Sequence, residues 1–305
     1  MLIQEERISG LSPASDLGPV PKISIGVPVY NGADTIARAL DSLLAQEFTD
    51  FELIISDNAS TDGTLEIVRA YSATDQRIRL IEQPVNRGAL ANFAFVLNAA
   101  VGEYFVWAAS DDIRSSDYLR VNYDFLVSHP EYVASTSPTV FDEQLLAPLV
   151  DGGGILGAAD LGARIISFLA IVHDNSCFYA LIRRELLKAA MSPIAWYLGF
   201  DWTIILRVVS AGPIALLDQG SVVRGSRGMS SNPSYIMTSS RVRKINWIFP
   251  FFDFSLAALR CARRTSWRDR LTIAYLLLRW NYRAFRAQLS LGLSNWRSLS
   301  RTVSI

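Results

Sequence analysis

The stretch ISIGVPVYNGADTIARALDSLL, residues 23–44, decides the fold. It begins with ISIGVPVY, a short apolar and β-branched run that is typical of a buried strand. The part that follows places Ile36, Ala39, Leu40 and Leu43 on one face of a helix. A buried strand that leads directly into an amphipathic helix is the repeating unit of an open α/β sheet. We therefore predict an α/β protein with a mostly parallel sheet flanked by helices.

The same alternation continues along the chain. Further strands are expected at residues 51–56, 78–82, 104–109, 132–141, 178–182 and 214–223. Further helices are expected at 61–71, capped by Thr61 or Asp62, and at 89–100, 116–128, 160–171, 184–190, 200–211, 235–263 and 267–290. Residues 1–21 read as a loose lead-in, and 224–234 as a flexible basic loop.

The bulk composition is that of a globular protein. Half of the 305 residues are hydrophobic, which is enough for a large core. Cys177 and Cys261 have neither metal-ligand spacing nor a disulfide framework, so we expect a reducing, cytoplasmic setting. We find no signal peptide, and no apolar run of the roughly 18 residues that a membrane-spanning helix needs.

The balanced net charge hides an asymmetry. Residues 1–223 hold 14 Lys/Arg against 27 Asp/Glu, whereas 224–305 hold 15 against 2. Such a basic, aromatic-rich tail indicates an anionic partner: a membrane surface, a lipid diphosphate or nucleic acid. In one interpretation its helices lie in a membrane interface; in the other, their apolar face packs on the acidic domain and the arginines offset its charge. The tail carries no recognised nucleic-acid module, so nucleic acid is not expected as the partner.

Polar residues follow the predicted strands at the points where those strands end. In an open α/β sheet, ligands bind outside the carboxyl ends of the strands. The residues at these positions are Pro28, Tyr30 and Asn31 after the first strand, Asp57 and Asn58 after the second, Asn86, Arg87 and Gly88 after the third, and Asp111 and Asp112 after the fourth. The sequence therefore predicts a ligand site at this edge.

Asp111 and Asp112 are adjacent carboxylates after an apolar strand, where a cation would relieve their repulsion. Mg²⁺ or Mn²⁺ prefers oxygen ligands and is often held by one or two carboxylates together with substrate phosphates. The alternative is that Asp112 or Ser115 simply starts the next helix.

Three motifs together carry a family resemblance. They are ISIGVPVYNGADTIARALDSLLAQ, LIISDNASTDGT and NRGALANFAFVLNAAVGEYFVWAASDD. In order, spacing and residue type, they resemble the nucleotide-binding half of the family-2 glycosyltransferases, over about residues 22–125. The resemblance implies a GT-A fold, a nucleotide-diphosphate sugar donor, a divalent metal and inversion at the anomeric carbon. It also implies a catalytic domain at 22–223, with 22–125 for the nucleotide-sugar and 126–223 for the acceptor, followed by a basic loop and C-terminal helices at 224–305.

The resemblance assigns donor contacts residue by residue. It implies a nucleoside pocket lined by Pro28, Val29, Tyr30 and Asn31. Asp57 would accept a hydrogen bond from the base imide N–H, which favours uracil or thymine; a helix cap is its other role. The remaining nucleotide-binding candidates, near the ribose and diphosphate, are Asn58, Asn86, Arg87, Gly88 and Asn92. Arg87 can also be a plain surface charge.

The metal motif departs from the commoner Asp-x-Asp-Asp. Ala109 replaces the first acid and leaves Ser110, Asp111 and Asp112. Metal coordination is therefore expected to be weaker. Either aspartate can be the direct ligand, while the other touches the ribose or the donor sugar.

An inverting transfer needs a general base that deprotonates the acceptor hydroxyl. The histidines His129 and His173 stand in settings typical of structural residues. Asp201, in LGFDWTIILRVVSAG, resembles the acidic motif that provides the base in this family, although Phe200 replaces the usual Glu. The other interpretation of Asp201 is an N-cap, and one residue can do both.

Two further groups of residues are candidates on the acceptor and leaving-group side. The segment HDNSCFYALIRRELLKA resembles the family's acceptor-side strand and helix, so His173, Asp174 and Asn175 are candidate acceptor contacts. Arg224 and Arg227 in the basic loop would neutralise the developing diphosphate charge, or else lie in solvent.

The prediction is thus a transferase that moves a sugar from a UDP- or dTDP-sugar to a saccharide or lipid-linked acceptor in cell-surface polysaccharide synthesis. If the tail binds lipid, the enzyme is peripheral on the inner face of the plasma membrane. A nucleotidyltransferase is disfavoured because VPVYNGAD lacks the basic phosphate loop of that class. A catalytically impaired nucleotide-sugar-binding protein, or a nucleic-acid-binding protein, is the remaining alternative.

Overall fold

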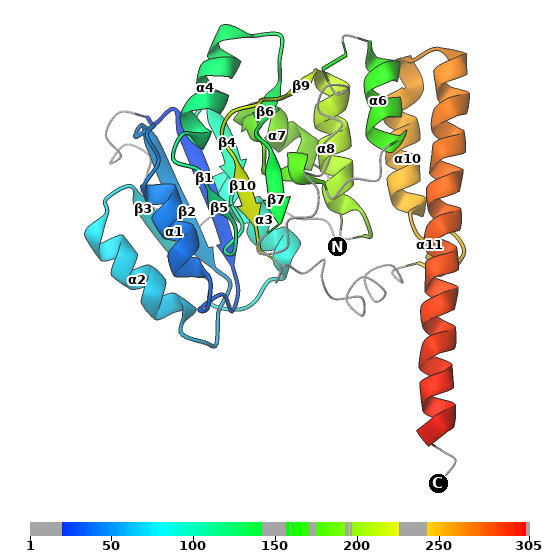
Figure 1. The fold of residues 1–305 in the computed structure, drawn as a ribbon, viewed down its shortest axis with the longest axis horizontal. Coiled ribbons are helices and arrows are strands. Elements are labelled where there is room, and N and C mark those ends of the chain that lie inside the picture. Colours follow the sequence, from blue (N-terminus) through cyan, green and yellow to red (C-terminus); the bar gives the residue numbers. More distant parts are fainter. Residues whose placement is uncertain are drawn as a thin grey trace.

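The computed structural model describes residues 20–141, 157–158, 160–170, 175–192, 195, 197–225 and 243–302, with backbone alone at 141 and 290–302. Seven strands form the main sheet in the order β3-β2-β1-β4-β8-β6-β9 (Figure 1). Their bounds are β1 Ile23–Val29, β2 Phe51–Asp57, β3 Ile78–Glu82, β4 Tyr104–Trp107, β6 Ala134–Thr136, β8 Leu181–Arg183 and β9 Ile214–Leu216. The first four strands of this order run parallel and β8 is antiparallel to both its neighbours, so the predicted fold class is confirmed.

Strand β2 shows how alternating side chains make two cores. Phe51, Leu53 and Ile55 point to one face of the sheet and pack with three helices. These helices are α1 Ile36–Leu44, α2 Thr64–Thr74 and α4 Tyr118–Ser128. Ile54 points to the opposite face, where a second and larger core lies.

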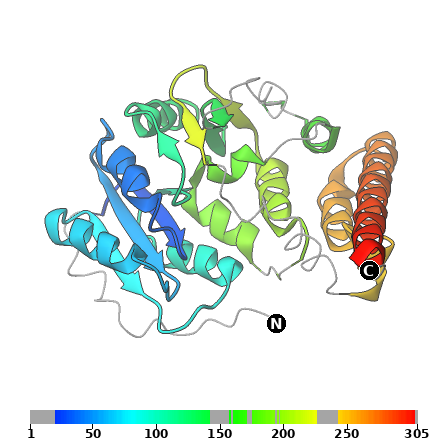
Figure 2. The same cartoon turned by 60° about the horizontal axis from the view of Figure 1, so that its bottom comes forward.

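The second core is built mainly from helices. It includes residues of α3 Ala89–Ala99, α6 Leu161–Ala170, α7 Arg184–Met191, α8 Phe200–Ala211, α10 Phe252–Cys261 and α11 Trp267–Thr302. Figures 1 and 2 both show α10 and α11 at one edge of the molecule, with α6 and α8 between them and the sheet. Among the described residues, no helix combines the length and apolar character that crossing a membrane requires.

Trp280 joins α11 to the rest of this core. Its ring stacks on Phe254 of α10 at 5.6 Å between centroids, and its Nε1 donates to the Leu169 carbonyl of α6 at 3.0 Å. Trp202 of α8 meets the same ring edge-on at 4.6 Å. The first half of α11 is therefore part of the folded body and not a free appendage.

The strand expected at 132–141 divides into β6 and β7 Thr139–Phe141, which belong to different sheets. Three further differences between predicted and observed elements have a clear physical reason. The expected strand at 178–182 begins as a 3₁₀ helix, η2 Ser176–Tyr179, because the chain must first turn around the left-handed Asn175 (φ 61°). The expected strand at 214–223 divides at Gly220 (φ 72°) into β9 and β10 Val222–Arg224. Strand β10 joins β5 Ile113–Arg114 and β7 Thr139–Phe141 in a small second sheet.

The third difference concerns the tail. Within the predicted helix at 235–263, α10 starts only at Phe252, because Pro250 cannot donate a helical hydrogen bond. Before it lies η4 Lys244–Trp247, and after it η5 Ala262–Arg264. Residues 226–242, which include Arg227, lie outside the described residues.

Trp280→Ala should lower the free energy of unfolding by about 3–5 kcal/mol, the usual cost of removing a large buried aromatic ring. Tyr282→Ala, two residues along the same helix but 61% exposed, should change it by less than about 0.5 kcal/mol. Chemical denaturation followed by circular dichroism measures both. Equal, small effects would contradict the packing of α11 on α6 and α10.

Candidate functional site

The ends of β1 and β4 lie at the point where the strand order reverses. β1 is flanked by β2 on one side and by β4 on the other, which is the topological switch point where open α/β sheets bind ligands. Its pairing with β4 stops at Gly26, whereas its pairing with β2 continues to Val29 opposite Asp57. Past Gly26, β1 pairs only with β2. The loops that follow β1, β2 and β4 therefore lie around the same end of the sheet.

Two of these loops are held together by side chain to backbone hydrogen bonds. Asn31, in a left-handed conformation (φ 53°), receives the Thr61 N–H on its Oδ1 at 2.8 Å and donates its own N–H to Ser60 Oγ at 2.9 Å. Asp62, one of the two predicted caps, accepts from Thr64 N at the start of α2 and from Ala33 N. The segment at 28–31 is thus fixed beside Asp57, with Val29 buried and Tyr30 half exposed.

Asp57, at the end of β2, is a buried acid beside these two loops. Its Oδ2 accepts the Ser60 N–H at 3.0 Å. Its Oδ1 has no hydrogen-bond partner among the described residues although the side chain is only 1% exposed. A buried carboxylate oxygen without a donor costs about 1–3 kcal/mol or more. This oxygen is therefore ready to accept an N–H from a ligand.

The loop after β3 is tied to the residue next to Asp57. Asn58 accepts from Arg87 N at 2.9 Å and donates to Asn86 Oδ1 at 3.0 Å. Asn86 Oδ1 also accepts from Gly88 N, in a turn that needs the positive φ of Gly88 (81°). The structure therefore brings these four predicted residues together, with the Arg87 side chain exposed.

Asn92 lies deeper, on α3. Its Nδ2 donates to the Ser56 carbonyl at 2.9 Å, and its Oδ1 accepts from Ser56 Oγ at 2.6 Å. Both ends of the amide are thus engaged with the strand residue that precedes Asp57. Through these contacts Asn92 fixes Ser56, and so the end of the strand that carries Asp57.

The Asp111-Asp112 pair lies against the chain that follows β10. Asp112 is 2% exposed; its Oδ1 accepts the Gly225 N–H at 3.2 Å, and its Oδ2 has no partner among the described residues. A Cβ built on Gly225 would lie 2.4 Å from Asp111 Oδ2, so only glycine allows this close approach. Ser110, half buried, lies beside Gly32 of the first loop.

These carboxylates fit one divalent ion only in part. No cluster of three or more His, Cys, Asp and Glu side chains occurs within the described part of the chain. The free Asp112 Oδ2 and the adjacent Asp111 supply the oxygen chemistry that Mg²⁺ or Mn²⁺ prefers, and phosphate oxygens would have to complete the shell.

Arg114 is a charged residue of this site that sequence reasoning missed. It is 3% exposed, donates from Nη2 to the Trp107 carbonyl at 2.8 Å, and lies over the Tyr118 ring at 5.2 Å. Burial raises the pKa of Asp112, while the positive charges of Arg114 and Arg224 lower it.

Asp201 lies in the first turn of α8, which starts at Phe200 as predicted; the N-cap is Gly199, so Asp201 is not the N-cap residue. Its Oδ2 accepts from Asn175 Nδ2 at 3.0 Å. Burial raises the pKa of Asp201, and the hydrogen bonds from Asn175 and from backbone N–H groups, with the charge of Arg224, act against that rise. The net result is a pKa of Asp201 above the ordinary range for aspartate.

Tyr179 was not predicted as a site residue, but the charges of both the Asp111-Asp112 pair and Asp201 act on it. Burial raises its pKa, and so do the negative charges of Asp112, Asp111 and Asp201, while Arg224 lowers it. The Arg224 guanidinium lies over its ring at 5.5 Å. The predicted metal pair, the predicted base and one of the two loop arginines thus all act electrostatically on one tyrosine.

The remaining candidates divide into two groups. His129 is stacked on Phe125 at 4.2 Å and bonds its carbonyl at the end of α4, which matches the structural role predicted for it. His173, Asp174 and Arg227 lie outside the described residues.

Comparison with known proteins identifies the family. The model of glycosyl transferase family 2 matches residues 24–190, more than half of the chain. The chain belongs to this family. It is 38% identical over 125 residues to the putative glycosyltransferase EpsE of Bacillus subtilis, a match over 40% of this chain and 45% of that protein. It is 40% identical over 109 residues to a poly(ribitol-phosphate) beta-glucosyltransferase of Bacillus spizizenii, over 34% of this chain and 17% of that protein.

Solved structures of the family share the fold. Staphylococcus aureus TarS 1–349 superposes with a TM-score of 0.60 at 19% identity, over 89% of this chain and 92% of that one. The mannosyltransferase PcManGT of Pyrobaculum calidifontis, in complex with GDP-Man and Mn²⁺, gives 0.54 at 19% identity, over 89% and 84%. The chain has the GT-A fold, and its last described element is the long C-terminal helix α11.

Gly225→Ala should push the Asp111 carboxylate aside and weaken binding of UDP with Mn²⁺ by about ten- to a hundredfold, the range expected when a charged contact is lost. Gly63→Ala is the matched control, because its Cβ would meet nothing closer than 3.9 Å. Isothermal titration calorimetry measures both. Unchanged affinity in Gly225→Ala would remove the Asp111 contact from the ligand site.

Proposed function

We propose that the chain is an inverting glycosyltransferase that moves a hexosyl unit from a UDP- or dTDP-sugar to a saccharide or lipid-linked acceptor. One observation carries the proposal: two buried carboxylate oxygens, Asp57 Oδ1 and Asp112 Oδ2, lie along the ligand-binding edge of the sheet and have no hydrogen-bond partner among the residues that the structure describes. Asp57 offers an acceptor to a pyrimidine N–H. Asp112 offers an oxygen to a cation, and Asp201 supplies a tuned base beyond Tyr179.

The nucleoside end of the donor is assigned to the loops around Asp57. In this proposal the imide N–H of uracil or thymine donates to Asp57 Oδ1, and Pro28, Val29, Tyr30 and Asn31 line the pocket. The hydrogen bonds from Asn31 to the loop after β2 hold these residues in place before the donor arrives. Such preorganisation lowers the cost of binding. An imide N–H flanked by two carbonyl groups occurs in uracil and thymine but not in adenine, guanine or cytosine, so uracil or thymine is favoured.

The diphosphate end is assigned to the loops around Asp112. Asp112 and Asp111 would hold Mg²⁺ or Mn²⁺, which supplies positive charge to the leaving diphosphate. Asn58, Asn86, Arg87 and Gly88 would contact the ribose and diphosphate, with Asn92 as a support, and Ser110 completes the motif. Arg224, already close to Asp112 and Asp201, adds a second positive charge. The positive charge of the buried Arg114 stabilises the ionised form of Asp112.

Asp201 is assigned as the general base. It takes the proton of the acceptor hydroxyl as the hydroxyl oxygen bonds to the anomeric carbon and the bond to the diphosphate oxygen breaks. Attack opposite the leaving group inverts the configuration. Asn175 orients the carboxylate through its hydrogen bond.

The acceptor is proposed to be part of a cell-surface polysaccharide. Relatives named for such pathways support this, among them the putative teichuronic acid biosynthesis glycosyltransferase TuaG of Bacillus subtilis, 35% identical over 107 residues. The chain spans 42% of that relative and 45% of EpsE. His173 and Asp174 remain candidate acceptor contacts, and Arg227 a candidate diphosphate contact. Peripheral association with the inner face of the plasma membrane is part of this proposal.

Asp57→Ala should weaken UDP binding by about ten- to a hundredfold, because a hydrogen bond to a charged group is worth about 1.5–3 kcal/mol. Glu66→Ala, which removes the same charge from an exposed position on α2, should bind UDP normally. A thermal-shift titration with UDP, dTDP and GDP reads out both variants. Wild-type indifference to every nucleotide would refute the donor assignment and favour a binding protein of another kind.

Asp201→Asn should retain UDP-sugar binding but lose transfer by roughly 10²–10⁴-fold, the usual contribution of a general base. In the wild type, transfer should fall on the acid side at a pH above the ordinary aspartate range, because burial raises the pKa of Asp201 and the protonated acid cannot act as a base. Asn175→Ala removes an interaction that lowers this pKa, so its acid limb should move to higher pH. Transfer rates against pH test this; near-normal transfer by Asp201→Asn would exclude it as the base.

A further inference from the structure

Helix α11 carries a continuous exposed stripe of large apolar and aromatic side chains. Trp267, Leu271, Tyr275, Leu278 and Tyr282 recur at spacings of 4, 4, 3 and 4 residues, which places them on one face. All five are between 61% and 63% exposed, and Leu289 continues the row. Exposed apolar patches of this extent on a soluble domain mark interaction sites.

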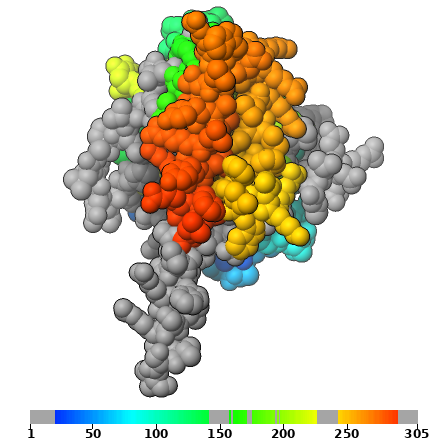
Figure 3. Space-filling view, turned by 90° about the vertical axis from the view of Figure 1, so that its right-hand side faces the viewer, coloured from blue at the N-terminus to red at the C-terminus, as the bar shows by residue number. Residues whose placement is uncertain are grey.

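This stripe is not the face that anchors the helix. The packing face uses Ile273, Leu276, Leu277 and Trp280, all of them buried. Figure 3 shows η4, α10 and α11 side by side on one outer face of the molecule. Trp247 and Ile248, at and just after the end of η4, are also more than half exposed. The apolar surface is thus larger than the folding of α11 requires.

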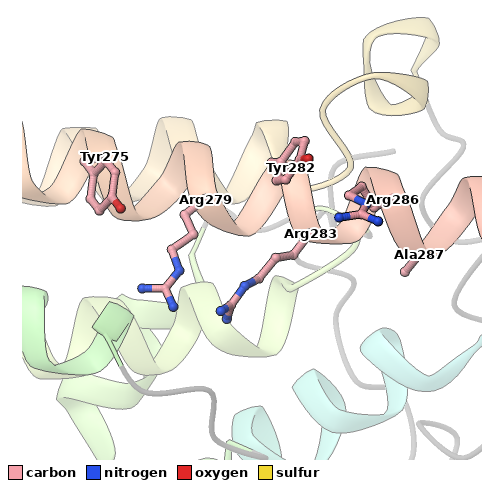
Figure 4. Close-up of a pocket in the computed structure, with 6 residues that line it drawn as sticks. All are labelled: Tyr275, Arg279, Tyr282, Arg283, Arg286 and Ala287. Carbon is pink, nitrogen blue, oxygen red and sulfur yellow. The ribbon is translucent and has the colours of Figure 1, made fainter.

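Arginines border the stripe along one flank. Arg279, Arg283 and Arg286, with Tyr275 and Tyr282, line a shallow open groove on α11 (Figure 4). Arg286 lies 5.9 Å from the centroid of the Tyr282 ring, and Arg268 5.5 Å from that of Trp267. Residues 243–289 hold ten Lys/Arg against two Asp/Glu, and no ion pair joins the three groove arginines to an acid within the described part of the chain. The groove therefore presents unneutralised positive charge beside apolar side chains.

Charge decides which partner fits this surface. The spacing of 4 and 3 residues would also suit a coiled coil with a second copy of the chain. Two copies, however, would bring arginine flanks together without acids to pair them, which is unfavourable. Anionic lipid head groups supply the opposite charge, and tryptophan and tyrosine favour the boundary between head groups and acyl chains.

We propose that the stripe and the arginine groove of α11 form one docking surface for a bilayer that contains anionic phospholipid, with α11 lying in the plane of the interface. The arginines contact lipid phosphates, and the stripe enters the head-group region. The inference deepens the membrane part of the proposed function by naming the surface. It does not depend on the donor site, because none of these residues belongs to that site.

Flotation with vesicles tests the surface on the full chain. The wild type should bind vesicles of phosphatidylcholine with phosphatidylglycerol at low salt, bind pure phosphatidylcholine much more weakly, and be released at high salt. Arg279→Gln with Arg283→Gln and Arg286→Gln should reduce partitioning on the order of a hundredfold, at about 1 kcal/mol per basic residue. Leu271→Ser with Leu278→Ser should also reduce it, without unfolding, because both side chains are exposed.

The matched control removes the same charge elsewhere. Arg38, Arg69 and Arg120 are exposed on α1, α2 and α4, and their replacement by Gln should leave flotation close to that of the wild type. Equal losses in both triple variants would overturn the proposal, since only net charge would then matter. So would absence of wild-type binding at low salt, or a wild-type dimer in light scattering that Leu271→Ser with Leu278→Ser converts to a monomer. UDP affinity should be unchanged in every α11 variant. A failure of vesicle binding can then be told apart from a failure of the proposed transferase activity.

Discussion

The site depends on two buried carboxylate oxygens that have no hydrogen-bond donor within the described part of the chain. Asp57 Oδ1 and Asp112 Oδ2 are held away from water by strands that fold for other reasons, so the fold itself bears the cost of their desolvation. A ligand that brings one N–H and one cation recovers that cost at two points. The proposed donor binding follows from these two unpaired oxygens of the described residues more directly than from any single sequence motif.

The neighbours of these acids come from distant parts of the chain. Asp112 meets Gly225, which is 113 positions later, through the pairing of β5 with β10. Asp201 meets Asn175 because the left-handed Asn175 turns the chain into η2 just before β8. Tyr179, at the end of the same short helix, has a pKa that the charges of Asp112, Asp111 and Asp201 raise. The second half of the chain thus brings Asn175, Tyr179, Asp201 and Gly225 to the acids that follow the first four strands.

Much of this could be predicted from the sequence, for a physical reason. Strands β1 to β4 have strong apolar patterns, and parallel pairing sends polar residues such as Asp57 and Asp111 to one edge without further information. Tyr179 and Arg114 could not be found in this way, because their importance depends on burial and on charges brought by other segments. The stripe of α11 was visible as an aromatic and basic tail, but only the packing of Trp280 shows which face of the helix remains exposed.

The account is tested most directly by the anomalous scattering of manganese in crystals grown with UDP and Mn²⁺. It predicts one anomalous peak within coordination distance of Asp112 Oδ2, with the uracil imide N–H donating to Asp57 Oδ1. A manganese peak away from Asp111 and Asp112, or a uracil ring that does not touch Asp57, would contradict it.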